Sequence, residues 1–460
     1  ARACRLLLRG APGEAVKTLR ELPPISSLHA MSAALRIAME AGDMETFGGI
    51  KESFIRRYGE KNPILRELAH MDLMRKMEPE LAWETFAHLQ RQTKPDRMAA
   101  AAALLSGNGS RIADLCRFFP ELPVQDPPSA GELANLREKS EKNPSDLLLT
   151  ALWLQYGTAA LRAEDWGTPS FVAALEDLKK AVERLPADSS WVMKKAARLG
   201  LWSSPGYAAR FLARLCGEPD ADVERNPHFC TSWMADPEAR DLYGRYLTAQ
   251  EQHAVFPAWV WEWLNANMPA APAVSAGDAF WQLRRLRYYL LVSPGHGREV
   301  AQKAGEMKHL ETHPDAEVRT EYAMLQAALG DMRPAAAQAA DPRLPLPYAR
   351  RLAHALIQSG MPVIVFPMLE RILQKPLEPR ARMDFVELRA RARIAAGQDA
   401  VGDCEELFAQ DPCAEHAALL VQAHLGSRDK NCRRIREVLE RFRDHPKLIF
   451  AVQAAQQACP

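Results

Sequence analysis

The sequence has no hydrophobic run long enough to cross a lipid bilayer. A membrane-spanning helix needs about 20 predominantly apolar residues. The longest candidates, such as residues 146–156 (DLLLTALWLQY), are shorter than this. They are expected to form buried helices, and the sequence predicts no membrane span.

An excess of charge of either sign is also missing. The 460 residues include 59 Lys and Arg against 58 Asp and Glu, which gives a formal net charge of +1. A nucleic-acid-binding protein of this size usually has a basic excess or a basic stripe. The balance argues against nucleic acid as a partner. RNA binding by 35-residue helical repeats is the least favoured reading, because the C-terminal units do not repeat the same polar positions.

Paired cysteine motifs are absent. The eight cysteines include no CxxC pair, and four of them lie after residue 400. A chain of this length can bury a large core without disulfides, so we expect at most one or two local disulfides there, if the protein is exported. The first residue is Ala1 rather than Met. A removed signal peptide would explain this start, and so would a fragment, so a periplasmic or envelope location and a cytoplasmic one both stay open.

Motifs for catalysis, cofactors and metals are missing as well. The chain has no GxSxG sequence, no P-loop and no Rossmann fingerprint. Two groups of Cys and His lack the short paired spacings of zinc sites. They are Cys216, His228 and Cys230, and Cys404, Cys413, His416, His424 and Cys432. The sequence predicts no catalytic residue, no cofactor and no metal ion.

The pattern that is present is helical. Apolar residues recur at steps of three and four over segments of ten to fifteen residues, and the strong helix formers Ala, Leu, Arg and Glu dominate. The one short β-branched run, residues 362–366 (PVIVF), fits the start of a helix as well as a strand. The sequence therefore predicts an all-α fold.

Breaks in the helical pattern are regular in the last third of the chain. Prolines stand 34, 36 and 34 residues apart, with glycines between them. These residues are Pro342, Pro376, Pro412 and Pro446, and Gly330, Gly360, Gly397 and Gly426. Gly is favoured where a helix ends in a left-handed residue, and Pro is tolerated where the next helix begins. Each unit therefore reads as a helix, a Gly turn, a second helix and a Pro stop.

A period near 34 residues with two helices in each unit resembles the tetratricopeptide repeat (TPR). The small–bulky–small–Pro pattern of the second helix in that family is matched at all four positions by Ala174, Leu178, Ala181 and Pro186. Ala82, Phe86, Leu89 and Pro95 match it with one extra residue before the Pro, and the Gly-Asp of the first helix occurs as Gly42-Asp43 and Gly330-Asp331. The resemblance implies a superhelical solenoid of antiparallel helix pairs.

Departures from the family pattern divide the chain. The Trp, Leu-Gly and Tyr of the first TPR helix are nowhere complete, and the stretch from about 190 to 300 is helical but irregular. We expect TPR-like repeats over 1–190, a Trp-rich helical region over 191–268 and further repeats over 278–460. The joint is residues 268–277, a stretch that is rich in Pro and Ala and uncharged up to Asp278.

Three tryptophans lie close together in residues 256–269 (FPAWVWEWLNANMP). On a helix, Trp259 and Trp263 share one face and Trp261 points away from it, with Glu262 as the only charged residue. Such a set can form an aromatic platform for a sugar or a Pro-rich peptide. The alternative is a helix buried on both sides, because a helix that is apolar all round usually belongs to a core.

A second candidate surface is residues 281–291 (WQLRRLRYYLL), where Arg284, Arg285, Arg287 and Tyr288 interleave basic and aromatic side chains. Such a mixture can bind an acidic partner or a single-stranded nucleic acid. The alternative is an amphipathic helix whose arginines are solvated on its outer side.

Two classes of function follow. The TPR resemblance implies a non-enzymatic scaffold or adaptor, whose concave surface binds another protein or a peptide. The alternative is an α/α-toroid enzyme acting on a carbohydrate, with residues 202–281 lining its cleft. Such an enzyme needs two carboxylates, and Glu262 and Asp278 are the first candidates.

Overall fold

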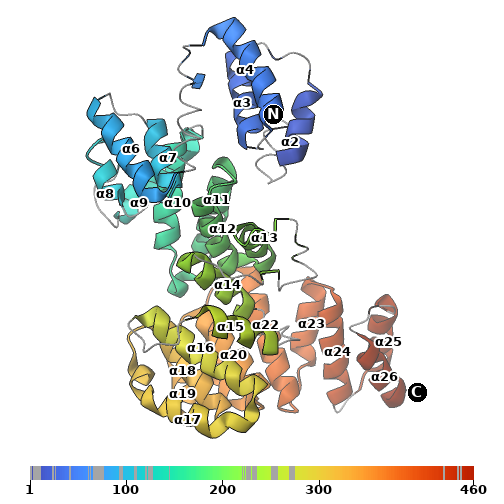
Figure 1. Ribbon diagram of the computed structural model, residues 1–460. Helices are drawn as coiled ribbons and strands as arrows, with labels where there is room; N and C mark the ends of the chain where they lie inside the picture. The colour runs from blue at the N-terminus through green and yellow to red at the C-terminus, as the bar shows by residue number, and fades with distance from the viewer. Residues whose placement is uncertain are drawn as a thin grey trace. The chain divides into compact units, whose positions relative to one another are not determined.

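A computed structural model of the chain is all-helical and shows no strand over the residues that it describes (Figure 1). No helix of this part of the chain is long and apolar enough to span a membrane, as predicted. The described residues are 3, 12–22, 25, 27–40, 43–60, 62, 64–65, 77–92, 97–107, 111–119, 122, 128–144, 146–219, 221, 223, 229–230, 236–249, 257–268, 275–427, 430–442, 445 and 448–459.

The chain divides into two compact units. Unit 1 consists of residues 1–161 and 173–250, and unit 2 consists of residues 162–172 and 251–460. The division near residue 250 differs from the joint predicted at 268–277, since both helices that flank that joint belong to unit 2. Residues 269–274 of the predicted joint lie outside the described residues.

Unit 1 is built from helices of four to sixteen residues. They are α2 (Pro12–Arg20), α3 (Leu28–Glu40), α4 (Met44–Tyr58), α6 (Pro79–Gln92), α7 (Arg97–Leu105), α8 (Ile112–Leu115), α9 (Ala130–Lys142), α10 (Leu147–Ala160), α11 (Pro169–Arg184, from residue 173), α12 (Ser190–Ser203), α13 (Pro205–Leu215) and α14 (Pro237–Ala249). Side-chain caps fix several starts: Asp43 accepts a hydrogen bond from the Thr46 N–H, and Ser129 and Glu132 form a capping box.

A close contact between two helices of unit 1 joins α12 and α13. A Cβ atom added at Gly200 would lie 2.6 Å from the Cα of Ala208 and 2.7 Å from its Cβ. Only a residue without a side chain permits this approach of one backbone to the other. The turn between the two helices is short, because Ser204 ends α12 and Pro205 begins α13.

The residues that carry the resemblance in unit 1 are buried in part, because Ala174 and Leu89 are only half-buried. Ala82 and Phe86 on α6, and Leu178 and Ala181 on α11, are almost completely shielded from water. A Cβ atom added at Gly157 of α10 would lie 2.6 Å from Leu178 Cδ2, so the bulky residue fills the space that a glycine leaves on a neighbouring helix. Pro95 lies outside the described residues.

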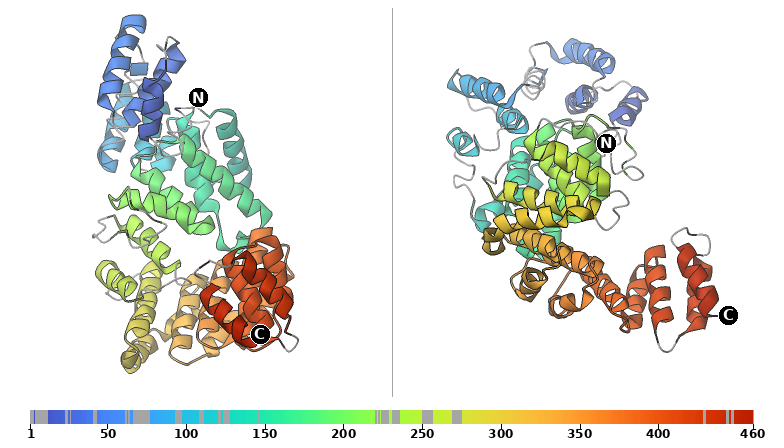
Figure 2. Two further views of the ribbon diagram at one scale, coloured as in Figure 1. Left: turned by 90° about the vertical axis from the view of Figure 1, so that its right-hand side faces the viewer. Right: turned by 60° about the horizontal axis from the view of Figure 1, so that its bottom comes forward.

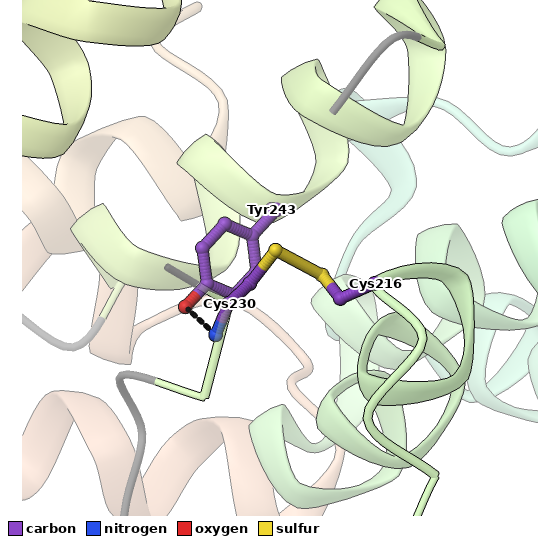
Figure 3. Close-up of a disulfide and its surroundings, with 3 residues drawn as sticks. All are labelled: Cys216, Cys230 and Tyr243. Atoms are coloured by element: carbon purple, nitrogen blue, oxygen red, sulfur yellow. Dashed lines mark hydrogen bonds between the residues drawn. A yellow bond between two sulfur atoms is a disulfide. The ribbon is translucent and has the colours of Figure 1, made fainter. Parts of the chain in front are cut away.

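A disulfide joins Cys216, at the end of α13, to Cys230 (Figure 3). The main-chain N–H of Cys230 donates a hydrogen bond of 3.1 Å to the Tyr243 hydroxyl on α14. Burial raises the pKa of Tyr243, so the phenol stays neutral. The segment that carries Cys230 is thereby attached to two helices of unit 1.

The helices of unit 2 include the two longest of the described residues, α16 and α22. They are α15 (Pro257–Asn267), α16 (Ala276–Val292), α17 (Gly297–Glu306), α18 (Ala316–Ala328), α19 (Arg333–Ala340), α20 (Leu346–Gln358), α21 (Phe366–Leu373), α22 (Pro379–Ala395), α23 (Val401–Gln410), α24 (Ala414–Gly426), α25 (Cys432–Arg441) and α26 (Ile449–Ala458). Residues 362–366, which fit a strand or a helix start, form the 3-10 turn η6 (Pro362–Val365) and the first residue of α21.

Glycines end three helices of unit 2 in the same way. Gly330, Gly360 and Gly397 have φ angles of 93°, 75° and 67°. In each case the residue after the glycine donates its N–H to the carbonyl five residues earlier, for example Asp331 to Gln326 at 2.9 Å. The predicted Gly turns are therefore confirmed at these positions. Gly426 differs, because it is the last residue of α24 itself.

Contacts in unit 2 join neighbouring helices and also every second helix. Helix α18 contacts α16 and α20, and α22 contacts α20 and α24. One hydrophobic core runs from α18 to α26, and the views agree that the C-terminal helices follow one another in a row (Figures 1 and 2). A second disulfide, between Cys432 and Cys459, connects α25 to the residue after α26. It lies in the part of the chain for which local disulfides were considered, whereas the pairing of Cys216 with Cys230 was not predicted.

A short segment from the middle of the sequence completes unit 2. The Trp166 ring packs edge-on against Phe385 at 6.5 Å between centroids. The carbonyl of Gly167 accepts a 2.7 Å hydrogen bond from the main-chain N–H of Glu378, the residue that caps α22. Gly167 has a φ of 80° and approaches Ala381 closely, so a side chain at this position would be strained.

Candidate functional site

The two segments singled out in the sequence form adjacent helices of unit 2. Pro257 begins α15, where a missing N–H is tolerated. Helix α16 begins at a capping box, in which Ser275 and Asp278 satisfy each other's main-chain N–H groups. The two helices pack against each other, so side chains of both line the boundary between them.

An aromatic row lies along this boundary. The Trp261 ring of α15 packs against the Tyr289 ring of α16 with 5.0 Å between centroids, and Tyr289 packs against His296 at 5.3 Å. Trp261 and Tyr289 are half-buried, and His296 is exposed. Aromatic rings in offset contact of this kind form a rigid apolar surface.

A polar pair continues the row one helical turn away. Arg285 lies four residues before Tyr289, and Asn265 lies four residues after Trp261. The Arg285 guanidinium donates a 2.7 Å hydrogen bond to Asn265 Oδ1, and partial burial lowers the pKa of Arg285. We call Trp261, Asn265, Arg285, Tyr289 and His296 the aromatic seam.

A buried ion network fixes α16 in unit 2. Arg284 and Arg287 donate hydrogen bonds of 2.6 and 2.9 Å to the two oxygens of Glu321 on α18. Glu321 is 0% exposed and Arg284 is 1% exposed. Burial alone would raise the pKa of the Glu321 carboxyl, but the charges of Arg284 and Arg287 outweigh burial and hold the pKa below its usual value.

Cation–π contacts extend this network to α20. The Arg284 guanidinium lies 4.5 Å from the centroid of Phe280, and that of Arg351 on α20 lies 5.9 Å from the same ring. Arg351 also donates a 2.9 Å hydrogen bond to Glu317 on α18. Paired charges and one shared ring thus join α18 and α20 to α16, the helix that carries Arg285 and Tyr289 of the seam.

The structure divides the predicted surface residues into two groups. Trp263, Arg284, Arg287 and Tyr288 are buried, whereas Trp259, Trp261 and Arg285 are partly exposed. The alternative in which the arginines of 281–291 are solvated is wrong for Arg284 and Arg287. The physical cause is Glu321, which lies 37 and 34 residues farther along the chain than Arg284 and Arg287. Its carboxylate supplies the counter-charge that allows both guanidiniums to be buried.

The two carboxylates considered for carbohydrate hydrolysis lie in different settings. Glu262 is exposed on α15. Asp278 accepts hydrogen bonds from the Ser275 N–H at 3.1 Å and from the Ser275 hydroxyl at 2.9 Å. One of its oxygens therefore serves to cap α16.

The cysteine and histidine groups are only partly brought together. Ligand atoms of Asp411, Cys413 and His416 lie within 4.8 Å of one another. The ring nitrogen Nδ1 of His416, however, is 2.7 Å from the main-chain oxygen of Asp411, so a metal ion that used this nitrogen would have to displace an existing hydrogen bond. Cys404 is buried and burial raises its pKa to about 12, and His228 lies outside the described residues.

Sequence reasoning missed Asn265 and His296 as parts of the seam. The signal for Asn265 was its spacing of four from Trp261, which places both on one side of a helix. No sequence signal indicates His296, because it belongs to the 3-10 turn η4 (Pro294–His296) that follows α16.

Comparison of the chain with protein-family models, with curated proteins and with solved structures gives no match.

Proposed function

We propose that unit 2 is a TPR-like solenoid of antiparallel helix pairs and that the chain is a non-enzymatic scaffold for protein–protein interaction. The support for the solenoid is the alternation of contacts. Helices α18, α20, α22, α24 and α26 begin at residues 316, 346, 379, 414 and 449, and each contacts the next member of this series. The steps of 30 to 35 residues, with a shorter helix between members, are typical of stacked repeats.

The observation that carries the interaction proposal is the aromatic seam. Half-exposed aromatic rings on rigid helices are the surface to which an extended, Pro-rich peptide docks, because such a peptide is already ordered before it binds. The Arg285 guanidinium, one turn from the rings, suits an acidic side chain of the peptide. The partner that fits best is a Pro-rich segment with at least one Asp or Glu.

A carbohydrate would also stack on Trp261, so the α/α-toroid enzyme is the competing proposal. Hydrolysis needs an acid and a second carboxylate on opposite sides of the bond. Asp278 is engaged in the cap of α16, so it is poorly placed to act as the second catalytic carboxylate beside Glu262. The seam therefore favours a peptide over a sugar.

The test is a selection from a displayed library of Pro-rich peptides, run in parallel with a glycan array. Wild-type protein should enrich peptides that combine Pro with Asp or Glu and should retain no glycan. The Trp261→Ala variant should lose this enrichment. The matched control is Leu291→Ala, which removes an exposed apolar side chain of α16 outside the seam. A glycan ligand whose hydrolysis stops on Glu262→Gln would replace the scaffold proposal with the enzyme.

A further inference from the structure

Lys195 on α12 of unit 1 is a half-buried lysine without a counter-charge of its own. Its ammonium nitrogen lies 5.6 Å from the centroid of the Trp191 ring, which is buried one turn earlier on the same helix. No ion pair of the described residues includes Lys195. Lysine side chains are rarely buried unless a carboxylate pairs with them, so this setting is unusual for an ammonium group.

The two cations that flank Lys195 on α12 each have a carboxylate partner. Lys194 Nζ lies 2.8 Å from a carboxylate oxygen of Asp236 and 3.4 Å from one of Glu238. The guanidinium of Arg198 lies 3.1 Å from the other oxygen of Glu238. Lys195 therefore stands between two positive charges, and the carboxylates at the start of α14 pair with those charges instead.

This setting favours the neutral form of the amine. Burial and the charge of Arg198 lower the pKa of Lys195 to about 8, the charge of Lys194 acts in the same direction, and Glu238 opposes them. At pH 7 an amine with this pKa is roughly one-tenth neutral, whereas an ordinary lysine is neutral on the order of three times in ten thousand. The neutral amine is the nucleophile, so desolvation beside other cations activates a lysine.

Lys303 of α17 is the opposite case in the same chain. Its ammonium lies 2.8 Å from a carboxylate oxygen of Glu299, and its side chain is 53% exposed. The hydrogen bond to Glu299 raises the pKa of Lys303. Lys303 is thus the more accessible amine and Lys195 the more readily deprotonated one, which allows accessibility and deprotonation to be told apart.

We propose that Lys195 is a modification site at which a small aldehyde forms an imine. The lone pair of the neutral amine attacks the carbonyl carbon, and a proton passes from nitrogen to the carbonyl oxygen to give a carbinolamine. Loss of the hydroxyl as water then forms the C=N bond, so the step consumes no oxidant or reductant. The site lies outside the aromatic seam and does not depend on the proposed scaffold function.

The test is reductive methylation of the full chain, with formaldehyde as the aldehyde. Formaldehyde is supplied at less than one equivalent per lysine, and cyanoborohydride reduces each imine to a stable N-methyl amine, which tandem mass spectrometry locates. At pH 7 Lys195 should be methylated about tenfold faster than Lys194 and Lys303, or more, because its amine is the most often neutral of the three. Above about pH 9 the rate at Lys195 should level off, and the rate at Lys303 should continue to rise.

Arg198 offers a matched pair of variants, since its side chain is 42% exposed and its replacement leaves the core intact. Arg198→Gln removes a flanking charge and frees Glu238 for Lys195, so methylation of Lys195 should slow about threefold or more. Arg198→Lys keeps the charge and should retain most of the wild-type rate, and the rate at Lys303 should be the same in all three proteins. A wild-type rate at Lys195 no higher than that at Lys303 would overturn the proposal, and so would a rate at Lys195 that Arg198→Gln leaves unchanged.

Discussion

The α12–α13 contact of unit 1 and the α16–α18 contact of unit 2 reach close helix packing by opposite means. Gly200 brings two backbones together because it has no side chain. Arg284, Arg287 and Glu321 bring two helices together through long charged side chains that are all buried. The first contact depends on volume and the second on charge balance, so substitutions that change one property should affect the two contacts differently.

Glu321→Gln tests the charge-dependent contact and should have the largest effect. The change keeps the volume but leaves two buried guanidiniums without their counter-charge. Breaking a buried ion pair in this way costs about 3–5 kcal/mol in the free energy of unfolding, measurable by urea denaturation. Replacing all three residues with apolar ones (Arg284→Met, Arg287→Leu, Glu321→Leu) should recover most of the loss. A Glu321→Gln variant as stable as the wild type would mean that the network contributes nothing.

Gly200→Ala tests the volume-dependent contact. The added methyl group would meet backbone atoms of Ala208, which cannot rotate away, so overpacking should cost about 1–3 kcal/mol. Gly206→Ala, in the first turn of α13, is the control, because its Cβ would meet only Ser204 Oγ at 3.9 Å. That change should be neutral or stabilise the fold slightly. Equal melting temperatures for the two variants would contradict the close approach.

The third test, with the smallest expected effect, is the dependence of the free energy of unfolding on pH, which should involve the charge-dependent contact and not the volume-dependent one. The folded-state pKa of Glu321 is held below its usual value of 4.5, so the stability that it contributes is present above that pH. It is lost as the pH falls from about 4.5 toward the lowered folded-state value. Gly200→Ala should retain this acid-induced loss, and Glu321→Gln should show less of it in denaturation series between pH 5 and pH 2.5. If the free energy of unfolding fell equally with pH in the wild type, Gly200→Ala and Glu321→Gln, the lowered pKa would not belong to Glu321.

Much of the regular part of the fold could be predicted from the sequence because its signals are local. Gly330, Gly360 and Gly397 end helices through their own φ angles, and the helical period of apolar residues is a property of each segment. The small residues Ala82 and Ala181 are likewise buried. The division near residue 250 was not predicted, since a Pro-rich composition at 268–277 indicates a loop but says nothing about which helices share a core.

The candidate site was predictable only in part. The sequence directed attention to residues 259–263 and 281–291, and both lie at one helix boundary. Arg284 and Arg287 are buried because Glu321 pairs with them, and Trp261 is partly exposed because of the way α15 packs against α16. Neither contact could be read from the sequence. Long-range partners of this kind leave no mark in one sequence.

The most direct test of the scaffold proposal is the affinity of a selected Pro-rich acidic peptide for the Trp261→Ala variant, measured by isothermal titration calorimetry. Loss of the Trp261 ring removes the centre of the seam and should reduce affinity by about tenfold or more, with the melting temperature close to that of the wild type because the ring is half-exposed. Leu291→Ala should bind as the wild type does. Unchanged affinity of Trp261→Ala for the peptide would contradict the assignment of the seam as the interaction surface.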